Sequence, residues 1–229
     1  MAINEQQYKE IKNKLNNYDA TLVAVSKTKP IEDIQALYAF GQRDFGENYV
    51  QELTDKQSQL PNDIRWHFIG HLQSNKVKYI APFVHLIHGV DDYKLLREIN
   101  KQAAKHKRVI DCLLQVHIAQ EETKFGLSDE ELKQIINEVI SNPSALNNIC
   151  IKGLMGMASN TDDEHKTGAE FRHLKGLFDK YAALSTSNFR LSILSMGMSS
   201  DYIIALEEGS TMVRIGSLLF GARDYSKAG

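Results

Sequence analysis

The sequence has few cysteines, few prolines, one tryptophan and no long apolar run. Its two cysteines, Cys112 and Cys150, form no CxxC pair and are too few for a disulfide framework. We expect both to be buried free thiols in a reducing compartment. No stretch approaches the roughly 18 apolar residues of a membrane span, and the polar start MAINEQQYKEIKNKL is not a secretory signal. These absences predict a soluble, cytoplasmic protein without a membrane partner.

An excess of charge of one sign is also missing. The formal net charge is −2 at pH 7 and the sequence pI is about 6.4, which argues against a nucleic-acid-binding face, since phosphate neutralisation needs excess Lys and Arg. The chain has no G-x-x-x-x-G-K-[ST], no G-x-G-x-x-G and no G-x-S-x-G. The simplest nucleotide sites and the nucleophile elbow of serine hydrolases are therefore excluded.

Histidines occur in two close pairs, His67 with His71 and His85 with His88, followed by His117. Spacings of four and three suit zinc when the pair lies on a helix. Here both pairs fall where a predicted strand runs into a loop, and no cysteine or carboxylate joins them at ligand spacing. We predict core or rim histidines and no metal site.

The chain alternates short apolar runs with longer amphipathic segments. An additional helix is predicted at residues 3–16. The predicted strands are 21–26, 43–46, 65–69, 84–88, 110–118, 149–157, 191–195 and 211–215. The helices between and after them are 31–40, 47–57, 75–80, 92–106, 128–141, 162–184 and 201–208, and Ser128 and Glu131 are spaced as a capping box. Eight strand–helix units without a linker predict one domain, 1–229, folded as an α/β (β/α)8 TIM barrel with an extra N-terminal helix. An open doubly wound sheet is the alternative.

Lys27 follows the first predicted strand, TLVAVS. In a barrel, that end of the strands forms the active face. Partial burial lowers the pKa of an amine, and a neutral amine attacks an aldehyde to form an imine. The pattern alone also allows a surface lysine at a strand end, as Lys29 close by illustrates.

Two Gly/Ser turns follow the last two predicted strands. They are SMGMSSD at 195–201 and RIGS at 214–217. Loops in these positions hold a phosphate in many barrels, because backbone N–H groups and helix starts attract anions. Helix capping by the serines explains the first turn equally well. Arg214 needs a partner, either a heterocycle nitrogen or an internal carboxylate.

Several longer motifs together resemble a known family. They are VAVSKTKP around Lys27, FGENYVQE at 45–52, WHFIGHLQSNK at 66–76, GLMGMAS at 153–159, LSMGMSSDY at 194–202 and GSTMVRIGSLLFGAR at 209–223. They span most of the chain in a fixed order and are similar to the pyridoxal phosphate homeostasis proteins. The resemblance implies the fold of the alanine racemase N-terminal domain (PLP fold type III). It also implies pyridoxal 5′-phosphate (PLP) as the cofactor and a role in intracellular PLP homeostasis and amino-acid and keto-acid balance.

The resemblance assigns roles to seven residues. Lys27 holds the cofactor as a covalent Schiff base, and Arg214 faces the pyridine nitrogen. The phosphate lies near Ser199, Gly216 and Ser217, and Asn48 and Met196 lie near the ring or its phosphate.

Little or no catalysis is expected. An arginine opposite the pyridine nitrogen keeps it unprotonated, which makes the ring a poorer electron sink. Racemisation needs acid–base groups on both faces of the α-carbon. Alanine racemases carry a tyrosine four residues after the lysine, where this chain has Ile31, and a second tyrosine in a separate domain supplied across a dimer. We expect no such domain, a monomer, and PLP-dependent apoenzymes as candidate recipients of the cofactor. The alternatives are a weak PLP-dependent amino-acid racemase and a Schiff-base lyase or phosphosugar enzyme that uses no PLP.

Overall fold

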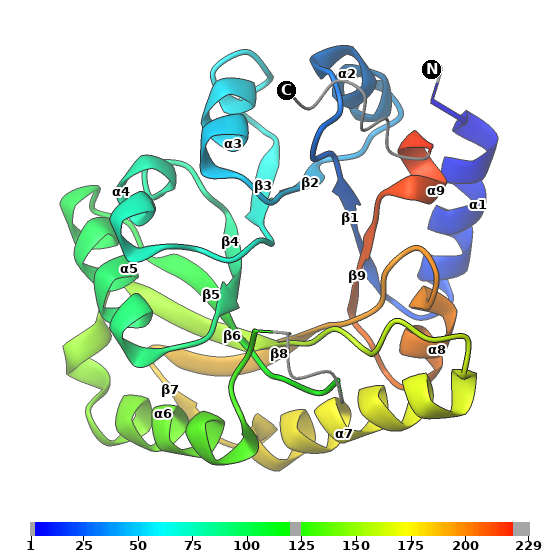
Figure 1. Cartoon of the computed structure of the whole chain (residues 1–229). Helices are drawn as coiled ribbons and strands as arrows, with labels where there is room; N and C mark the ends of the chain where they lie inside the picture. Colours follow the sequence, from blue (N-terminus) through cyan, green and yellow to red (C-terminus); the bar gives the residue numbers. More distant parts are fainter. Residues whose placement is uncertain (1–2, 120–124, 222–229) are drawn as a thin grey trace.

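The computed structural model describes residues 3–119 and 125–221. Over these ranges eight parallel strands close into a barrel (Figure 1). The hydrogen-bonded order is β6-β5-β4-β3-β2-β1-β9-β8, and the pairing of β6 with β8 completes the ring. The strands are β1 (Thr21–Val25), β2 (Asp44–Glu47), β3 (Arg65–Phe68), β4 (Leu86–Val90), β5 (Ile110–Gln115), β6 (Ile149–Met155), β8 (Phe189–Ser195) and β9 (Met212–Ile215). The predicted barrel is confirmed, and the open sheet is wrong.

Helices surround this barrel. The α-helices are α1 (Glu5–Asn16), α2 (Ile31–Ala39), α3 (Val50–Gln57), α4 (Val77–Ile80), α5 (Tyr93–Lys105), α6 (Asp129–Ser141), α7 (Glu164–Ala182), α8 (Tyr202–Glu207) and α9 (Ser217–Phe220). Helix α1 contacts β1 and α9, and it buries Tyr8, Ile11 and Leu15. Helix α6 begins with the expected capping box, in which Ser128 and Glu131 satisfy each other's backbone N–H groups.

The strands are buried on both faces, as the apolar runs predict. Inside the barrel a small cluster contains Val23, Leu86, Leu113, Met155 and Met212, which come from five different strands. A larger cluster fills the space between strands and helices. Cys112 and Cys150 are buried free thiols, as predicted.

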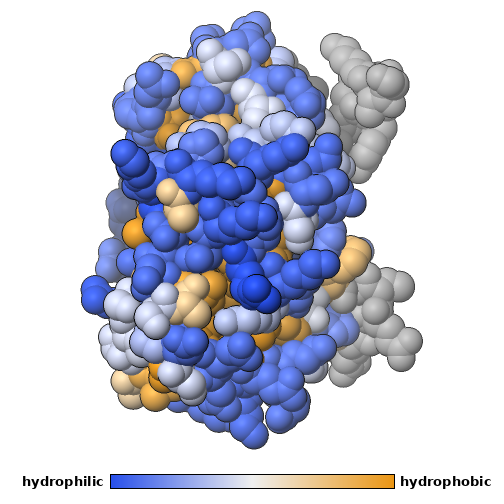
Figure 2. All heavy atoms as spheres, turned by 90° about the vertical axis from the view of Figure 1, so that its left-hand side faces the viewer, coloured by the Kyte–Doolittle hydropathy of each residue, from blue (hydrophilic) through white to orange (hydrophobic). Residues whose placement is uncertain are grey.

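The outer face that includes α4 and α5 is mostly hydrophilic. Figure 2 shows it from the left-hand side of Figure 1, with hydrophobic side chains visible only in small separate areas. These helices therefore turn an apolar stripe to the barrel and a polar face to water. Among the described residues, no helix combines the length and the apolar character that crossing a membrane requires.

Some elements differ from the sequence prediction. Strand β4 lies two residues later than expected, so that Gly89 and Val90 fall inside it, and strand β5 ends three residues earlier than expected. Two short elements were not predicted: β7 (Ser185–Thr186), which pairs antiparallel with β8, and the 3₁₀ turn η2 (Pro143–Leu146). A second 3₁₀ turn, η1 (Ser74–Lys76), precedes α4 and occupies the start of the predicted 75–80 helix.

Candidate functional site

A cavity of about 390 Å³ lies at the carboxyl ends of the strands. Residues that follow β1, β2, β3, β6, β8 and β9 contribute to its wall. Six of the seven residues singled out from the sequence line it, namely Lys27, Asn48, Ser199, Arg214, Gly216 and Ser217. The seventh, Met196, is fully buried in the large apolar core, and the methionines that line the cavity are Met157 and Met198.

Lys27 lies in a tight turn whose flanking residues are fixed by hydrogen bonds. The backbone N–H of Lys29 donates to the carbonyl of Ser26 over 3.0 Å, and Thr28 has a left-handed φ of 62°. The N–H of Thr28 donates to Glu52 over 2.6 Å, and the Ser26 hydroxyl donates to Glu47 over 2.6 Å. The backbone on both sides of Lys27 is therefore held by the α3 region, and the side chain itself is half-buried.

The ammonium group of Lys56 connects these contacts. It donates to the Ser26 carbonyl (2.7 Å), to Glu47 (2.8 Å) and to Glu52 (2.6 Å). Glu47 is fully buried at the end of β2. Burial raises the pKa of Glu47 to about 7, although the charge of Lys56 opposes the shift. The network is a buried support directly beneath the Lys27 turn.

The part of the cavity wall formed by the loops after β8 and β9 is rich in hydroxyl groups and glycine. The Ser199 hydroxyl accepts a hydrogen bond from the Gly216 N–H over 3.2 Å, which joins the loops after β8 and β9. At Gly216 a Cβ would lie 3.3 Å from the Val25 carbonyl oxygen, so a larger residue would be crowded against β1. Lys29 donates to the carbonyls of Phe220 (2.9 Å) and Gly221 (3.4 Å), which ties the end of α9 to the Lys27 turn.

Asn48 follows β2 and has a buried amide oxygen. This Oδ1 has no hydrogen-bond partner within the described residues, and Asn48 belongs to the cavity wall. A buried polar atom without a partner costs free energy, so such atoms are rare in the absence of a ligand or water.

Arg214 is buried on β9. Its Nη1 donates to the carbonyl (2.9 Å) and hydroxyl (2.7 Å) of Ser195, and its Nη2 donates to the Gly156 carbonyl over 3.1 Å. Burial lowers its pKa to about 10, against the attraction of Asp201. The guanidinium therefore stays charged at neutral pH. The sequence left two partners open for Arg214, and the structure gives it neutral oxygens rather than a carboxylate.

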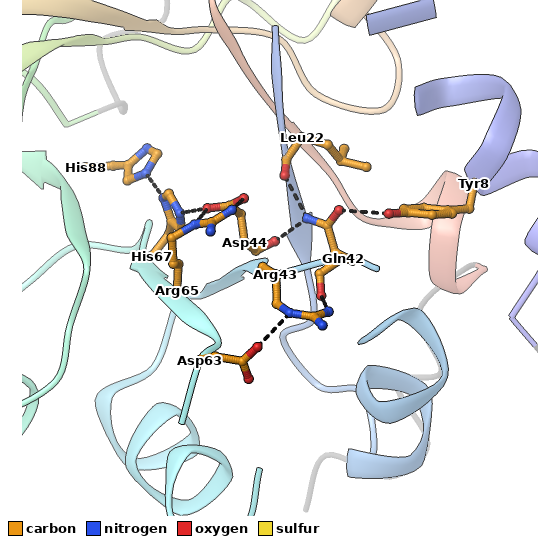
Figure 3. Close-up of polar contacts among 9 residues, drawn as sticks. All are labelled: Tyr8, Leu22, Gln42, Arg43, Asp44, Asp63, Arg65, His67 and His88. Carbon is orange, nitrogen blue, oxygen red and sulfur yellow. Dashed lines mark hydrogen bonds and ion pairs between the residues drawn. The ribbon is translucent and has the colours of Figure 1, made fainter. Parts of the chain in front are cut away.

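His67 and His85 lie at the other end of the barrel, whereas His71 and His117 follow the carboxyl ends of β3 and β5. Asp44, His67 and His85 place ligand-type atoms within 4.8 Å of one another at the amino ends of the strands. Arg65 donates to both carboxylate oxygens of Asp44 (Figure 3). This carboxylate already has a cation as its partner, and a metal ion beside Arg65 would be repelled. The absence of a metal site stays a prediction.

Sequence reasoning did not assign Glu47, Glu52 and Lys56, although two signals were present. Glu52 and Lys56 are spaced four apart on one helix, a spacing that brings side chains together. A carboxylate such as Glu47 at the end of a buried strand needs a cation to offset its burial. Of the motif at 209–223, Ala222 and Arg223 lie outside the described residues.

Comparison with known proteins agrees with this architecture. Residues 4–224 match the family model described as the alanine racemase N-terminal domain. Alanine racemase from Bartonella henselae has a TM-score of 0.68 at 17% identity, covering 96% of this chain and 60% of its own. At that identity the likeness shows the fold alone. Fold and cavity thus define a barrel of the alanine racemase N-terminal class.

Relatives of higher sequence identity define the family within this class. A protein from Pasteurella multocida (strain Pm70) is 39% identical, and one from Aquifex aeolicus (strain VF5) is 42% identical. Each alignment covers 90% of this chain and 88% of the relative, and both relatives are named pyridoxal phosphate homeostasis protein. PipY of Synechococcus elongatus PCC7942, solved with PLP bound, has a TM-score of 0.85 at 33% identity and covers 95% of this chain and 99% of its own. The chain belongs to the pyridoxal phosphate homeostasis protein family.

Proposed function

We propose that this protein binds PLP in the cavity at the carboxyl ends of the strands, as a Schiff base on Lys27, and acts in PLP homeostasis with little or no catalysis. PLP-dependent apoenzymes are the proposed recipients of the cofactor. The role in amino-acid and keto-acid balance would follow from that supply. The names of the relatives and the PLP-bound PipY structure support the choice of cofactor.

The composition of the cavity wall carries the proposal. Among the described residues that line it, the ionisable side chains are Lys27, Lys29 and Arg214, and none is a carboxylate. Hydroxyls of Ser199, Ser200 and Ser217 complete a polar wall that suits a phosphate group. The amide side chain of Asn48 belongs to the same wall.

The cofactor would supply an aldehyde, with which the Lys27 amine condenses as one water leaves and a C=N bond forms. The hydrogen bonds around Ser26 and Thr28 fix the turn that presents this amine. Ser199 and Gly216 hold the loops after β8 and β9 together. These residues bind and orient, and none of those contacts moves a proton.

Weak or absent catalysis follows from the charges on the wall. Arg214 keeps its positive charge, which disfavours a second positive charge on a neighbouring ring nitrogen. Racemisation needs two acid–base groups on opposite faces of one carbon. Within the described part of the chain, no histidine, tyrosine or carboxylate lines the cavity to supply the second group.

Borohydride trapping tests the covalent assignment. Protein incubated with PLP is reduced, digested and mapped by mass spectrometry, for the wild type and for Lys27→Ala. Wild type should carry one pyridoxyl group on Lys27, and Lys27→Ala should lose it. Lys29→Ala is the matched control, because Lys29 lines the same cavity from the same turn, and it should keep the adduct. An equal yield of adduct in Lys27→Ala would overturn the assignment.

Exchange of the α-proton of an amino acid in deuterated water tests the catalytic part. We expect no exchange above that of free PLP. Exchange that depends on the protein and is lost in Lys27→Ala would instead establish the racemase alternative.

A further inference from the structure

A chain of buried polar side chains crosses the interior of the barrel. It starts at Arg214 on β9, continues through Ser195 on β8 and His88 on β4 to His67 on β3, and ends at Asp44 on β2. All five residues are buried. Figure 3 shows the last part, where His88 contacts His67, and where His67 and Arg65 both contact Asp44. The chain joins the wall of the proposed cofactor cavity to a second cavity at the amino ends of the strands, of about 340 Å³.

One proton arrangement gives every donor in this chain an acceptor. Asp44 stays ionised, because hydrogen bonds from Arg65 and His67 outweigh burial and hold its pKa well below the usual range. A carboxylate only accepts, so His67 must donate from Nε2 over 3.0 Å. If Nε2 carries the single proton of the His67 ring, Nδ1 accepts from His88 Nε2–H over 2.9 Å.

The same logic continues to the arginine. Burial holds the pKa of His88 well below its ordinary value, so this ring is neutral. With its proton on Nε2, its Nδ1 accepts from the Ser195 hydroxyl over 3.1 Å. That hydroxyl oxygen in turn accepts from Arg214 Nη1 over 2.7 Å. Five groups thus form four hydrogen bonds, and in each of them the donor is on the side of Arg214 and the acceptor on the side of Asp44.

The opposite assignment fits less well. If His67 carried two protons, His88 would donate from Nδ1 to Ser195. The Ser195 oxygen would then face two donors, and its own proton would have no acceptor among residues 3–119 and 125–221. Hydrogen bonds in a low-dielectric interior polarise one another, so an unbroken direction strengthens each of them.

We propose that Ser195, His88, His67 and Asp44 are positioning residues for Arg214, forming a one-directional hydrogen-bond chain that holds this buried cation against the cofactor cavity. The contacts of Arg214 are to neutral oxygens of Ser195 and Gly156, and the chain connects it to an anion. Its effect on cofactor binding rests on the proposed function, whereas its proton arrangement does not.

The proton arrangement is read directly from the protein without added PLP. Long-range ¹H–¹⁵N spectra distinguish neutral from doubly protonated imidazoles and identify the protonated nitrogen. We expect His67 and His88 both neutral with the proton on Nε2 at neutral pH. A doubly protonated His67, or a proton on Nδ1 of either ring, would overturn the chain.

The coupling is tested with two variants and a control. Asp44→Asn removes the anion, and Ser195→Ala removes the link while keeping the Ser195 carbonyl that Arg214 also uses. Both should weaken PLP affinity at least about fivefold, the lower end of coupling between distant sites, and should shift the absorbance maximum of bound PLP. Asp111→Asn removes a carboxylate from the same second cavity, outside the chain, and should change neither.

The outcomes separate the two proposals. A wild type that does not bind PLP ends the proposed function, while the nitrogen spectra still decide the chain. A wild type that binds PLP, with folded Asp44→Asn and Ser195→Ala showing wild-type affinity and spectrum, ends the positioning role. If Asp44→Asn fails to fold, Ser195→Ala alone decides whether the chain positions Arg214.

Discussion

The two ends of strand β2 carry buried carboxylates with opposite electrostatics. Asp44 begins the strand and Glu47 ends it. Burial opposes ionisation at both positions. The pKa of Asp44 is nevertheless lowered, whereas that of Glu47 is raised to about 7. Hence burial alone does not decide whether a carboxylate is charged.

The number of oxygens with partners explains the difference. Both oxygens of Asp44 accept from Arg65, and Oδ1 also accepts from His67. In Glu47, Ser26 and Lys56 both donate to Oε1, and Oε2 has no partner within the described residues. A planar guanidinium satisfies two oxygens at once, and an ammonium acts as a point charge. At the amino end of β2, both oxygens of Asp44 are therefore paired with a cation. At the carboxyl end, beside Lys27, one oxygen of Glu47 is buried without a partner among the described residues.

The largest expected effect comes from removing Lys56, the cation paired with Glu47 at the carboxyl end of β2. Lys56→Met leaves Glu47 buried without its partner, and we expect a loss of about 3–5 kcal/mol in the free energy of unfolding, measured by urea denaturation. The double variant Glu47→Gln/Lys56→Met should recover part of this loss, because it leaves no charge at Glu47. If Lys56→Met unfolds like the wild type, the buried network does not support the Lys27 turn.

The contributions of Asp44 and Glu47 to stability should depend on pH in opposite ways. Glu47 has a raised pKa, so its contribution is fully present below 4.5, the ordinary value, and is lost as pH rises to about 7. Over that window the stability advantage of wild type over Glu47→Gln should fall by about 2–3 kcal/mol. Asp44 has a lowered pKa, so its contribution is present above 3.8 and is lost only in stronger acid.

Denaturation of wild type and Glu47→Gln at several pH values measures this difference directly. The comparison cancels groups that titrate in both proteins. A difference that stays constant from pH 4.5 to 8 would show that Glu47 ionises normally. The same series with Asp44→Asn should show its largest change at the acid end.

The barrel was predictable from the sequence, because most of its buried parallel strands are short apolar runs and several helices begin at a capping residue, as α6 does at Ser128. Besides β4, six strands were placed within two residues of both observed ends, as at Thr21–Val25, and β5 ends three residues earlier than predicted. Strand β4 was placed two residues too early, with Gly89 outside it. In fact a Cβ at Gly89 would lie 2.6 Å from the Gly70 carbonyl oxygen, so this glycine is required by a close approach within the sheet.

The sequence also did not reveal the histidine chain. His88 was correctly placed in the fourth strand, but nothing in the sequence indicated that it faces His67 across β3 and β4. The contact depends on the register, which pairs His67 with Leu86, and short parallel strands do not reveal their register in sequence. The residues of the cavity wall near Lys27 could be predicted from the sequence, because they follow strand ends within motifs. Met196 was assigned from the same motif and yet packs in the core, since motif membership does not give side-chain direction.

The smallest expected effect tests the charge of the two cavities. The wall near Lys27 lacks carboxylates among its described residues, whereas Asp19, Asp44 and Asp111 line the second cavity. Ser217→Asp introduces a negative charge beside the proposed phosphate position. Like charges repel, so PLP affinity should fall about tenfold, equivalent to about 1.4 kcal/mol, measured by titration of the bound-cofactor absorbance.

Ser192→Asp is the matched control for this change. Ser192 is also exposed and lines the second cavity, so the same substitution adds the same charge at the opposite end of the barrel. It should leave PLP affinity unchanged, because that charge is far from the phosphate and screened by salt. Equal losses in both variants would mean that net charge governs binding. A loss confined to Ser217→Asp would place the phosphate at the loop after β9, since repulsion by one carboxylate decays with distance.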